Sequence, residues 1–327
     1  MSEVRKKLGR PVATAAAAVV LSLTASGCVT VHGELEVVPT TDKAEAARAL
    51  DAFVSAYNKA EKTYDRSADA GYVTGALGAI DAAKLKAGHT LSPDGNKNHK
   101  PLELTDPNFT IPKKAGWPRW FVADSDNNRV ANSRWVMVFT RNDDSEPWAV
   151  SYLTLFAKGK MPAIKKDADG FAEAVAADAK GLAMKPGDLS DKYTGYLQSG
   201  GDGFADGPYT SQWRANRKKA TRPGLAMQFI DEPLTSGDYA PVALRTEDGG
   251  ALVFFTIRRY EKQTASAGSD LPAISPSVKA LMSGDAKQSA TYGYVGGQAA
   301  LDPAAGSADG GVRIMSRVEG ITTAEGS

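Results

Sequence analysis

Three short apolar runs in the first half of the chain constrain its fold most strongly. They are rich in β-branched and aromatic residues, and two acidic segments, DSDNN and NDDSEP, separate them. Such runs with turn residues between them are typical of neighbouring strands joined by short hairpins. The sequence therefore predicts a three-stranded antiparallel meander formed by residues 119–123, 134–141 and 148–156.

Two helical patterns precede this meander. Asp42 is a good N-cap residue, and Glu45 follows at the spacing of a capping box. Apolar residues then recur at steps that place them on one helix face: Leu50, Phe53, Val54, Tyr57 and Tyr64. A weaker helical pattern covers residues 72–85. The Pro-, Gly- and Asn-rich segment 88–118 is predicted to be mainly loop.

The second half of the chain repeats this order of elements. A helix is predicted to start at Asp169, with its apolar face at Phe171, Val175 and Leu182, and another covers residues 189–198. Strands follow at three places: residues 241–246, 251–262 and 311–321. The Ala-, Gly- and Ser-rich segments are predicted to be mobile surface loops: 263–277 and 283–311.

Helices that precede an antiparallel sheet in each half predict an α+β fold with two lobes, 42–160 and 168–327. The segments WPRWFVADSDNN and YAPVALRTEDGG also align as aromatic start, strand and acidic turn. A diverged duplication explains this similarity, and chance likeness of common β patterns is the alternative. The order of elements is similar to nuclear-transport-factor-2-like domains, in which a bent sheet wraps a long first helix. A shared fold does not imply a shared function.

The N-terminus has the composition of a secretory signal peptide. Four basic residues lie within the first ten positions, and the fourteen residues 12–25 carry no charge. A membrane-spanning helix needs about 20 predominantly apolar residues, so this run is too short to span. A basic start, a short apolar middle and small residues before a cleavage site predict that residues 1–27 are removed.

The residues at the predicted cleavage site resemble the lipobox of bacterial lipoproteins. The segment reads Ala25, Ser26, Gly27 and Cys28. In that family the cysteine becomes the first mature residue and carries acyl chains. The family favours leucine where this chain has Ala25, and an ordinary signal peptidase would cut at the same bond. Simple secretion and an uncleaved anchor are therefore alternatives to lipidation at Cys28.

With the lipobox, a tether at 28–41 and two similar halves, the chain resembles uncharacterised secreted lipoproteins of actinobacteria. The resemblance implies attachment to membrane lipid through palmitate-type acyl chains on Cys28, at the extracytoplasmic face of the cell membrane. Cys28 is the single cysteine, so no intrachain disulfide is possible. A buried structural cysteine is the competing interpretation.

The charge of the mature chain argues against general polyanion binding. The first 27 residues carry four basic residues and one acidic residue, so their removal changes the net charge from +1 to −2. A chain without a strong positive charge is not expected to bind nucleic acid.

Familiar catalytic and cofactor motifs are absent from the sequence. It contains no HExxH, GxSxG, SxxK, GxGxxG or P-loop pattern. A metal site at His89 and His99 is less well supported than solvated loop histidines. Asp124, Asp126 and Asn128 lack the glycine and glutamate of a calcium loop, so a hairpin turn is favoured. We therefore predict no catalytic residue, metal or cofactor.

One basic cluster stands above the background composition. The segment WRANRKKATR concentrates cations beside an aromatic residue: Trp213, Arg214, Arg217, Lys218, Lys219 and Arg222. Residues three and four apart share a helix face, so one face concentrates this charge. The cluster is a candidate site for anionic lipid headgroups or wall polymers. A solvated face with a half-buried tryptophan is the alternative.

Four tryptophans flank the predicted meander and allow two interpretations. They are Trp117, Trp120, Trp135 and Trp148. Core packing explains them most simply, and a ligand groove lined by aromatic side chains is the second interpretation.

These features favour a non-catalytic binding or assembly module of the cell envelope. The partner is an envelope polymer or a membrane protein. The alternatives are a hydrolase that uses carboxylates not identifiable from sequence, and a receptor for a small molecule.

Overall fold

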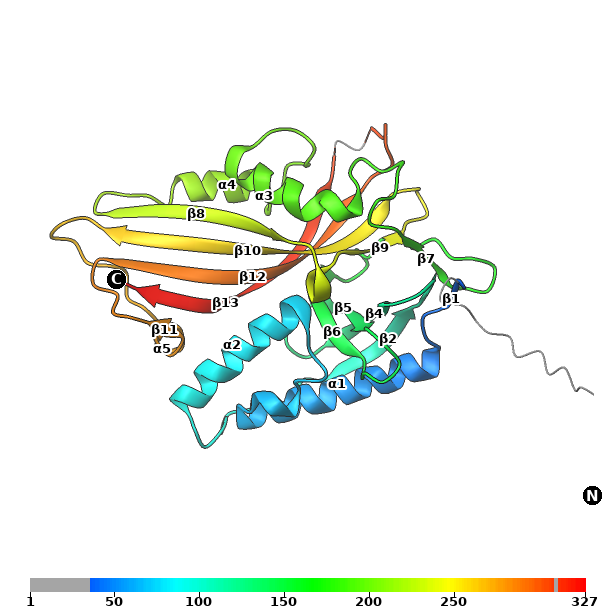
Figure 1. The fold of residues 1–327 in the computed structure, drawn as a ribbon, viewed down its shortest axis with the longest axis horizontal. Coiled ribbons are helices and arrows are strands. Elements are labelled where there is room, and N and C mark those ends of the chain that lie inside the picture. The colour runs from blue at the N-terminus through cyan, green and yellow to red at the C-terminus, as the bar shows by residue number, and fades with distance from the viewer. Residues whose placement is uncertain (1–35, 309–310) are drawn as a thin grey trace, which may run out of the picture. The chain divides into compact units, whose positions relative to one another are not determined.

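The computed structural model describes residues 36–308 and 311–327. Within these residues, helices and strands form a mixed α+β fold with two sheets (Figure 1). The helices are α1 Lys43–Thr63, α2 Gly75–Leu91, α3 Leu189–Ser199, α4 Ser211–Lys218 and α5 Pro276–Lys279. The strands of the smaller sheet, in spatial order, are β2 Leu104–Thr110, β4 Arg119–Asn127, β5 Ser133–Arg141 and β6 Ala149–Ala157.

The larger sheet has the order β1-β3-β7-β9-β10-β12-β13-β11, and β8 also pairs with β10. Its shorter strands are β1 Val38–Pro39, β3 Pro112–Lys114, β7 Ala172–Val175, β9 Val242–Arg245 and β11 Met282–Ser283. Its longer strands are β8 Leu225–Leu234, β10 Ala251–Ala265, β12 Ser289–Asp302 and β13 Arg313–Gly326.

The predicted first helix and meander are confirmed. The Asp42 side chain accepts a hydrogen bond from the Glu45 amide at 2.7 Å, which caps α1. The Glu45 carboxylate does not complete a capping box. It accepts instead from the Thr41 hydroxyl at 2.6 Å and from the Trp148 indole at 3.0 Å. These bonds fix the start of α1 against the smaller sheet.

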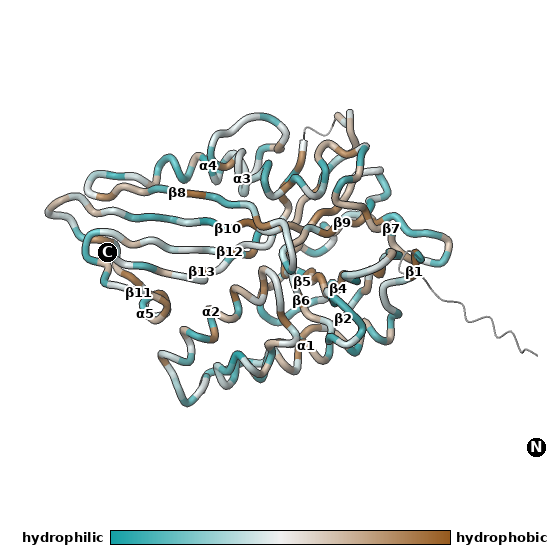
Figure 2. Tube along the Cα trace, viewed as in Figure 1, coloured by the Kyte–Doolittle hydropathy of each residue, from teal (hydrophilic) through white to brown (hydrophobic). Residues whose placement is uncertain are grey.

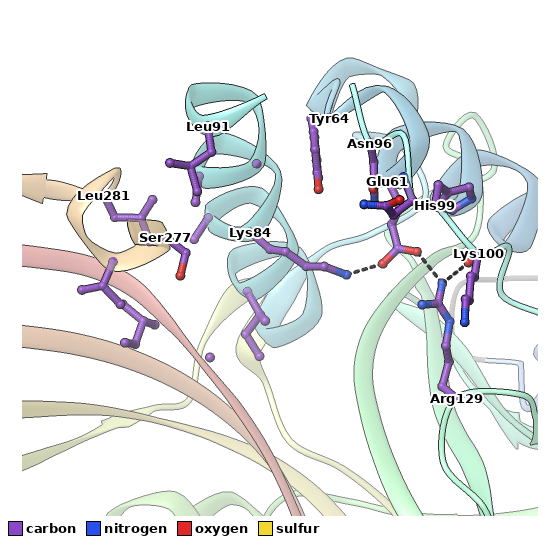
Figure 3. A pocket seen from close by; sticks show the side chains of 18 residues that line it. Glu61, Tyr64, Lys84, Leu91, Asn96, His99, Lys100, Arg129, Ser277 and Leu281 are labelled. Atoms are coloured by element: carbon purple, nitrogen blue, oxygen red, sulfur yellow. Dashed lines mark hydrogen bonds and ion pairs between the residues drawn. The ribbon is translucent and has the colours of Figure 1, made fainter. Parts of the chain in front are cut away.

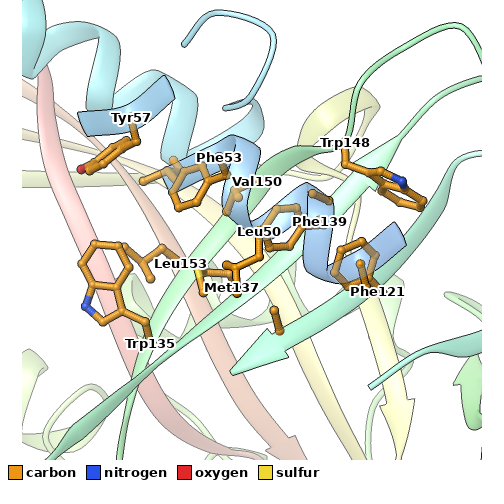
Figure 4. Packing of buried hydrophobic residues seen from close by; sticks show 14 of the residues in the cluster. Leu50, Phe53, Tyr57, Phe121, Trp135, Met137, Phe139, Trp148, Val150 and Leu153 are labelled. Carbon is orange, nitrogen blue, oxygen red and sulfur yellow. The ribbon is translucent and has the colours of Figure 1, made fainter. Parts of the chain in front are cut away.

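The apolar face of α1 packs on one face of the smaller sheet (Figure 4). Phe53 lies edge-on to Phe139 at 6.0 Å, and Phe139 stacks on Phe121 at 4.8 Å. Leu50 and Tyr57 are buried in the same cluster. The apolar helix face predicted from the sequence is therefore the face that is buried.

The two sheets and their helices form four layers. Side chains alternate between the faces of a strand, so Leu252 and Phe254 of β10 pack against the smaller sheet. Val253 and Phe255 face the opposite way and pack with Leu189 and other residues of α3. In Figure 2 the first part of β10 is hydrophobic, and its end is hydrophilic.

Helix α2 contacts both sheets, through β6, β12 and β13. Its position depends on small residues in β12. A Cβ atom on Gly297 would lie 3.5 Å from the Tyr152 ring and 3.6 Å from the Cβ atom of Ala76 in α2. A larger side chain at position 297 would therefore push these elements apart.

Two predictions of local structure are wrong. The helix expected from Asp169 is replaced by turns and by β7, which pairs with β3 and β9. About half of the expected mobile loop 283–311 is β12, a strand between β10 and β13. The segment 88–118 is mainly loop, as expected, although it also contains β2 and β3. In the two wrong predictions, pairing with other strands overrides the helical pattern after Asp169 and the loop composition of 289–302.

The predicted lobes 42–160 and 168–327 share a core. Tyr152 of β6 packs against Phe254 of β10, and β3 of the first segment pairs with β7 of the second. The lobe boundaries and the duplication stay predictions. The signal peptide 1–27, Cys28 and most of the tether 28–41 lie outside the described residues.

Candidate functional site

A cavity of about 590 Å³ lies between α1, α2, α5 and β13 (Figure 3). We call it the α2 cavity. It is lined by Glu61, Tyr64, Ile80, Ala83, Lys84, Ala87, Gly88, Leu91, Asn96, Asn98, His99, Lys100, Arg129, Ser277, Val278, Leu281, Gly320 and Ile321. This volume is within the range of pockets that hold small organic ligands.

One side of the α2 cavity is apolar. Ile80, Ala83, Ala87 and Leu91 follow one another along a single face of α2. Val278 of α5, Leu281 of the turn after it and Ile321 of β13 line it from the other elements. Leu91 is 51% exposed, which is unusual for a leucine, and it marks the open rim of this apolar wall.

The other side of the cavity carries charge. Glu61 of α1 is only 5% exposed. Its carboxylate accepts hydrogen bonds from the Lys84 amino group and, at 2.7 Å, from the Arg129 guanidinium. Arg129 also donates to the backbone carbonyl of Lys100 at 2.8 Å. The charged wall therefore holds three cationic side chains and one carboxylate.

The segment that carries Asn96 to Lys100 is fastened to α1. Asn58 donates to the Leu102 carbonyl at 2.9 Å and accepts from the Leu102 amide at 2.6 Å. The Asn96 amide donates to the Lys62 carbonyl at 2.8 Å. These backbone contacts hold the polar wall in place while the Lys100 side chain stays exposed.

Two glycines allow the walls to approach each other. A Cβ atom on Gly88 would lie 2.3 Å from the Tyr64 ring, so α2 passes directly against that ring. A Cβ atom on Gly320 of β13 would lie 2.6 Å from the Ile80 side chain. Any side chain at either position would have to displace a residue that lines the cavity.

The basic cluster predicted from the sequence lies on and after α4, on the other side of the larger sheet from α1 and α2 (Figure 1). The structure divides it into an inner and an outer part. Arg217 points inward and binds Asp231 of β8 with N–O distances of 2.5 and 2.8 Å. Trp213 packs beneath Arg317 at 3.7 Å. Both side chains therefore contribute to the interior.

The outer part of the cluster faces solvent. Lys218, Lys219 and Arg222 are exposed, and Arg214 is half-buried over the Tyr196 ring at 5.3 Å. A groove of about 420 Å³ beside them is lined by Leu197, Gln198, Arg214, Arg217, Lys218, Phe229 and Ile230. The predicted anion site stays a prediction for these outer residues.

The tryptophans near the meander lie mainly in the core. Trp120, Trp135 and Trp148 are all buried, and Trp117 is half-buried. Core packing is therefore confirmed for the three buried tryptophans, of which Trp120 also borders a cavity of about 470 Å³ without a second aromatic residue in its lining. The Trp148 indole is further used to bind Glu45.

The weak metal candidates are explained by other contacts. Asp124 and Asp126 both bind Arg134, at 2.5 and 3.0 Å. His89 lies on α2, and His99 lines the α2 cavity. In residues 36–308 and 311–327 no group of three or more His, Cys, Asp or Glu side chains is arranged to hold a metal ion.

Sequence reasoning missed Glu61, Lys84 and Arg129. A signal was present for Glu61, which follows Leu50, Phe53 and Tyr57 on the apolar face of α1. A charged residue on such a face needs a partner when it is buried. The partners come from α2 and from the turn after β4, which are distant in the sequence.

The relatives of this chain among known proteins are lipoproteins of Streptomyces. An uncharacterized lipoprotein of Streptomyces coelicolor is 58% identical over 322 residues, covering 98% of this chain and 97% of the relative. One of Streptomyces avermitilis has the same identity and coverage. A further uncharacterized lipoprotein of Streptomyces coelicolor is 24% identical, covering 90% and 88%.

No solved structure matches this chain. None of the helices in the described part of the chain has the length and hydropathy required to cross a bilayer. The predicted resemblance to actinobacterial lipoproteins is confirmed. Residues 37–326 match the family described as Domain of unknown function (DUF8094), and the chain belongs to this family of uncharacterised lipoproteins.

Proposed function

We propose that this chain is a binding module anchored by acylated Cys28 on the extracytoplasmic face of the cell membrane. The lipoprotein names of its relatives and its own lipobox support this position. Acyl chains add about 0.8 kcal/mol of membrane affinity per buried CH₂ group, so more than one chain gives firm attachment. Labelling cells with a fatty-acid analogue tests this step, because the label should be absent from a Cys28→Ser variant.

The ligand that suits the α2 cavity is an amphipathic molecule with an acidic group. One observation supports this proposal: an apolar wall from α2 and α5 faces a charged wall with three cations and one carboxylate. The apolar wall favours burial of a hydrocarbon chain. The excess of cations favours an anionic head, which Lys84 and Lys100 can reach from the rim.

The state of the acidic group in the α2 cavity favours binding over hydrolysis. Glu61 is the one Asp or Glu among the residues that line this cavity, and Lys84 and Arg129 already bind its carboxylate. A general acid or base must come within hydrogen-bonding distance of its substrate. We therefore expect no turnover of labelled envelope fragments by the purified protein.

Laurate provides a direct test of the proposed ligand class. The delipidated protein is titrated with laurate and, separately, with dodecylamine, which has the same chain length and the opposite charge. Laurate should raise the melting temperature, and dodecylamine should not. Binding of both amphiphiles with equal affinity would contradict a preference for anions.

Two lysines of the same loop provide a matched pair of variants. Lys100 lines the cavity and Lys97 does not, although both side chains are exposed. Charge reversal of an exposed contact changes binding by roughly 1.4 kcal/mol, so Lys100→Glu should weaken laurate binding about tenfold. Lys97→Glu should leave it unchanged. Equal losses in both variants would indicate a general charge effect.

The outer basic residues support a second, weaker binding surface. Lys218, Lys219 and Arg222 extend into solvent beside the groove at Arg214 and Phe229. Such exposed cations attract anionic lipid headgroups with about 1 kcal/mol each near a membrane surface. This surface is expected to assist contact with the membrane rather than to select a ligand.

A further inference from the structure

Two aspartates are buried side by side behind the α2 cavity without a partner for their charge. Asp69 follows a short 3₁₀ turn, and Asp81 lies in the middle of α2. Their exposed fractions are 0% and 1%. None of the four carboxyl oxygens accepts a hydrogen bond from a donor group in the described structure, and the group that each aspartate faces is the carboxyl of the other. A buried carboxylate without a partner is costly, so such groups require a specific explanation.

The two carboxyl groups lie within hydrogen-bonding distance of each other. They border a cavity of about 330 Å³ that is also lined by Thr74, Gly78 and Tyr239. Lys84 lies one turn after Asp81, but its amino group binds Glu61. Arg66, an exposed side chain, also lines this cavity, but within the described residues no ion pair joins it to either aspartate. The pair therefore has no cationic side chain bound to it, and it borders a cavity large enough to admit water.

We propose that Asp69 and Asp81 bind one divalent cation of the calcium type. Their four oxygens are the hard ligands that calcium prefers, and two bidentate carboxylates supply four of its six to eight ligands. Water in the adjoining cavity supplies the remaining positions. This site is separate from the α2 cavity and does not depend on the function proposed for it.

Other cations fit these two carboxylates less well. Zinc prefers three or four protein ligands that include histidine or cysteine, and no such group is present in the described residues. Magnesium gives up its waters reluctantly.

A proton shared by Asp69 and Asp81 competes with the cation for the same oxygens. Burial and the facing carboxylate of Asp81 raise the pKa of Asp69 to about 8. Without a cation, one proton therefore lies between the two groups at neutral pH. A divalent ion would replace that proton and neutralise both carboxylates.

Calcium titration of the EDTA-treated protein tests the proposal. With a Kd of about 0.1 mM, typical of extracellular calcium modules, about 10 mM CaCl₂ should raise the melting temperature by about 4 °C. Asp69→Asn and Asp81→Asn should each abolish this rise. Asp51→Asn is the matched control, because Asp51 is an exposed aspartate of α1 and should not alter it.

Terbium luminescence gives a second measurement that does not require a thermal transition. Tyr239 lines the same cavity and can transfer excitation to a bound terbium ion. Emission that calcium displaces in the wild type, and that both asparagine variants lack, supports the site. The proposal is overturned if neither calcium nor terbium gives a signal, which means that the pair only shares a proton. It is also overturned if the signals persist in both variants.

Discussion

The inner arginine of the basic cluster offers a sharp test of how the structure divides that cluster. We expect Arg217→Ala to lower the free energy of unfolding by about 3–5 kcal/mol, the usual result of removing one partner from a buried ion pair. The side chains of Arg217 and Asp231 are 8% and 0% exposed, and both Asp231 oxygens accept hydrogen bonds from the guanidinium. Truncation therefore leaves a buried carboxylate without its partner.

Packing adds to this effect. The guanidinium lies 5.0 Å from the Phe229 ring and 5.3 Å from the Trp213 ring. Cation–π contacts of this kind are worth about 0.5–2 kcal/mol each. Since they are lost together with the ion pair, a cost near the upper end of the range is expected for Arg217→Ala.

Urea unfolding at pH 7, followed by tryptophan fluorescence, measures this cost. Lys218→Ala is the matched control, because the neighbouring lysine is exposed and its loss should cost less than about 0.5 kcal/mol. Replacing both Arg217 and Asp231 with apolar residues of similar size should be less costly than Arg217→Ala alone, because no charge stays buried. If Arg217→Ala and Lys218→Ala were equally stable, the division of the basic cluster into a buried inner part and an exposed outer part would be refuted.

Three further outcomes follow from particular side chains. Burial raises the pKa of Asp302 to about 6, so the folded state binds this proton more tightly than the unfolded state. Its contribution to stability is complete below about pH 4 and falls by about 3 kcal/mol as the pH rises through 6; Asp302→Asn should remove this part of the pH dependence of urea unfolding. Glu61→Gln should cost about 1–2 kcal/mol in the same assay, yet tighten laurate binding because the cavity becomes more positive. Charge reversal of Lys218 and Lys219 should reduce sedimentation with anionic vesicles and change stability by less than about 0.5 kcal/mol, and unchanged sedimentation would remove the outer surface as a membrane contact.

The first half of the fold was predictable because its signals are local. The Asp42 cap, the apolar face through Leu50 and Phe53, and the turns between strands specify α1 and the meander from nearby residues. In contrast, β12 contains Gly293, Gly296 and Gly297, which have the composition of a loop. Its strand is specified by pairing with β10 and β13 and by the close approach of α2, and neither can be read from local composition.

The candidate sites were hidden from the sequence for a related reason. Glu61 and Arg129 are 68 positions apart, and their partnership depends on the packing of α1 against the turn after β4. Asp69 and Asp81 are closer, but nothing in a helical pattern shows that both carboxyl groups turn inward. By contrast, the basic cluster is conspicuous in the sequence, yet its Arg217 is a structural residue that is buried in an ion pair with Asp231. The density of basic residues in the sequence therefore identified the outer basic surface. The two candidate sites became visible only through the burial of their carboxylates.

Helix α2 joins the two proposed sites physically. Asp81 faces Asp69, and Lys84, one turn later, binds Glu61 at the wall of the α2 cavity. The same helix packs on β6, β12 and β13, so it cannot move at one site without changing its contacts at the other. If a cation at Asp81 alters the affinity for laurate, thermodynamic linkage requires laurate to alter the affinity for the cation by the same factor. Unequal factors would show that one of the two ligands also binds elsewhere on the protein.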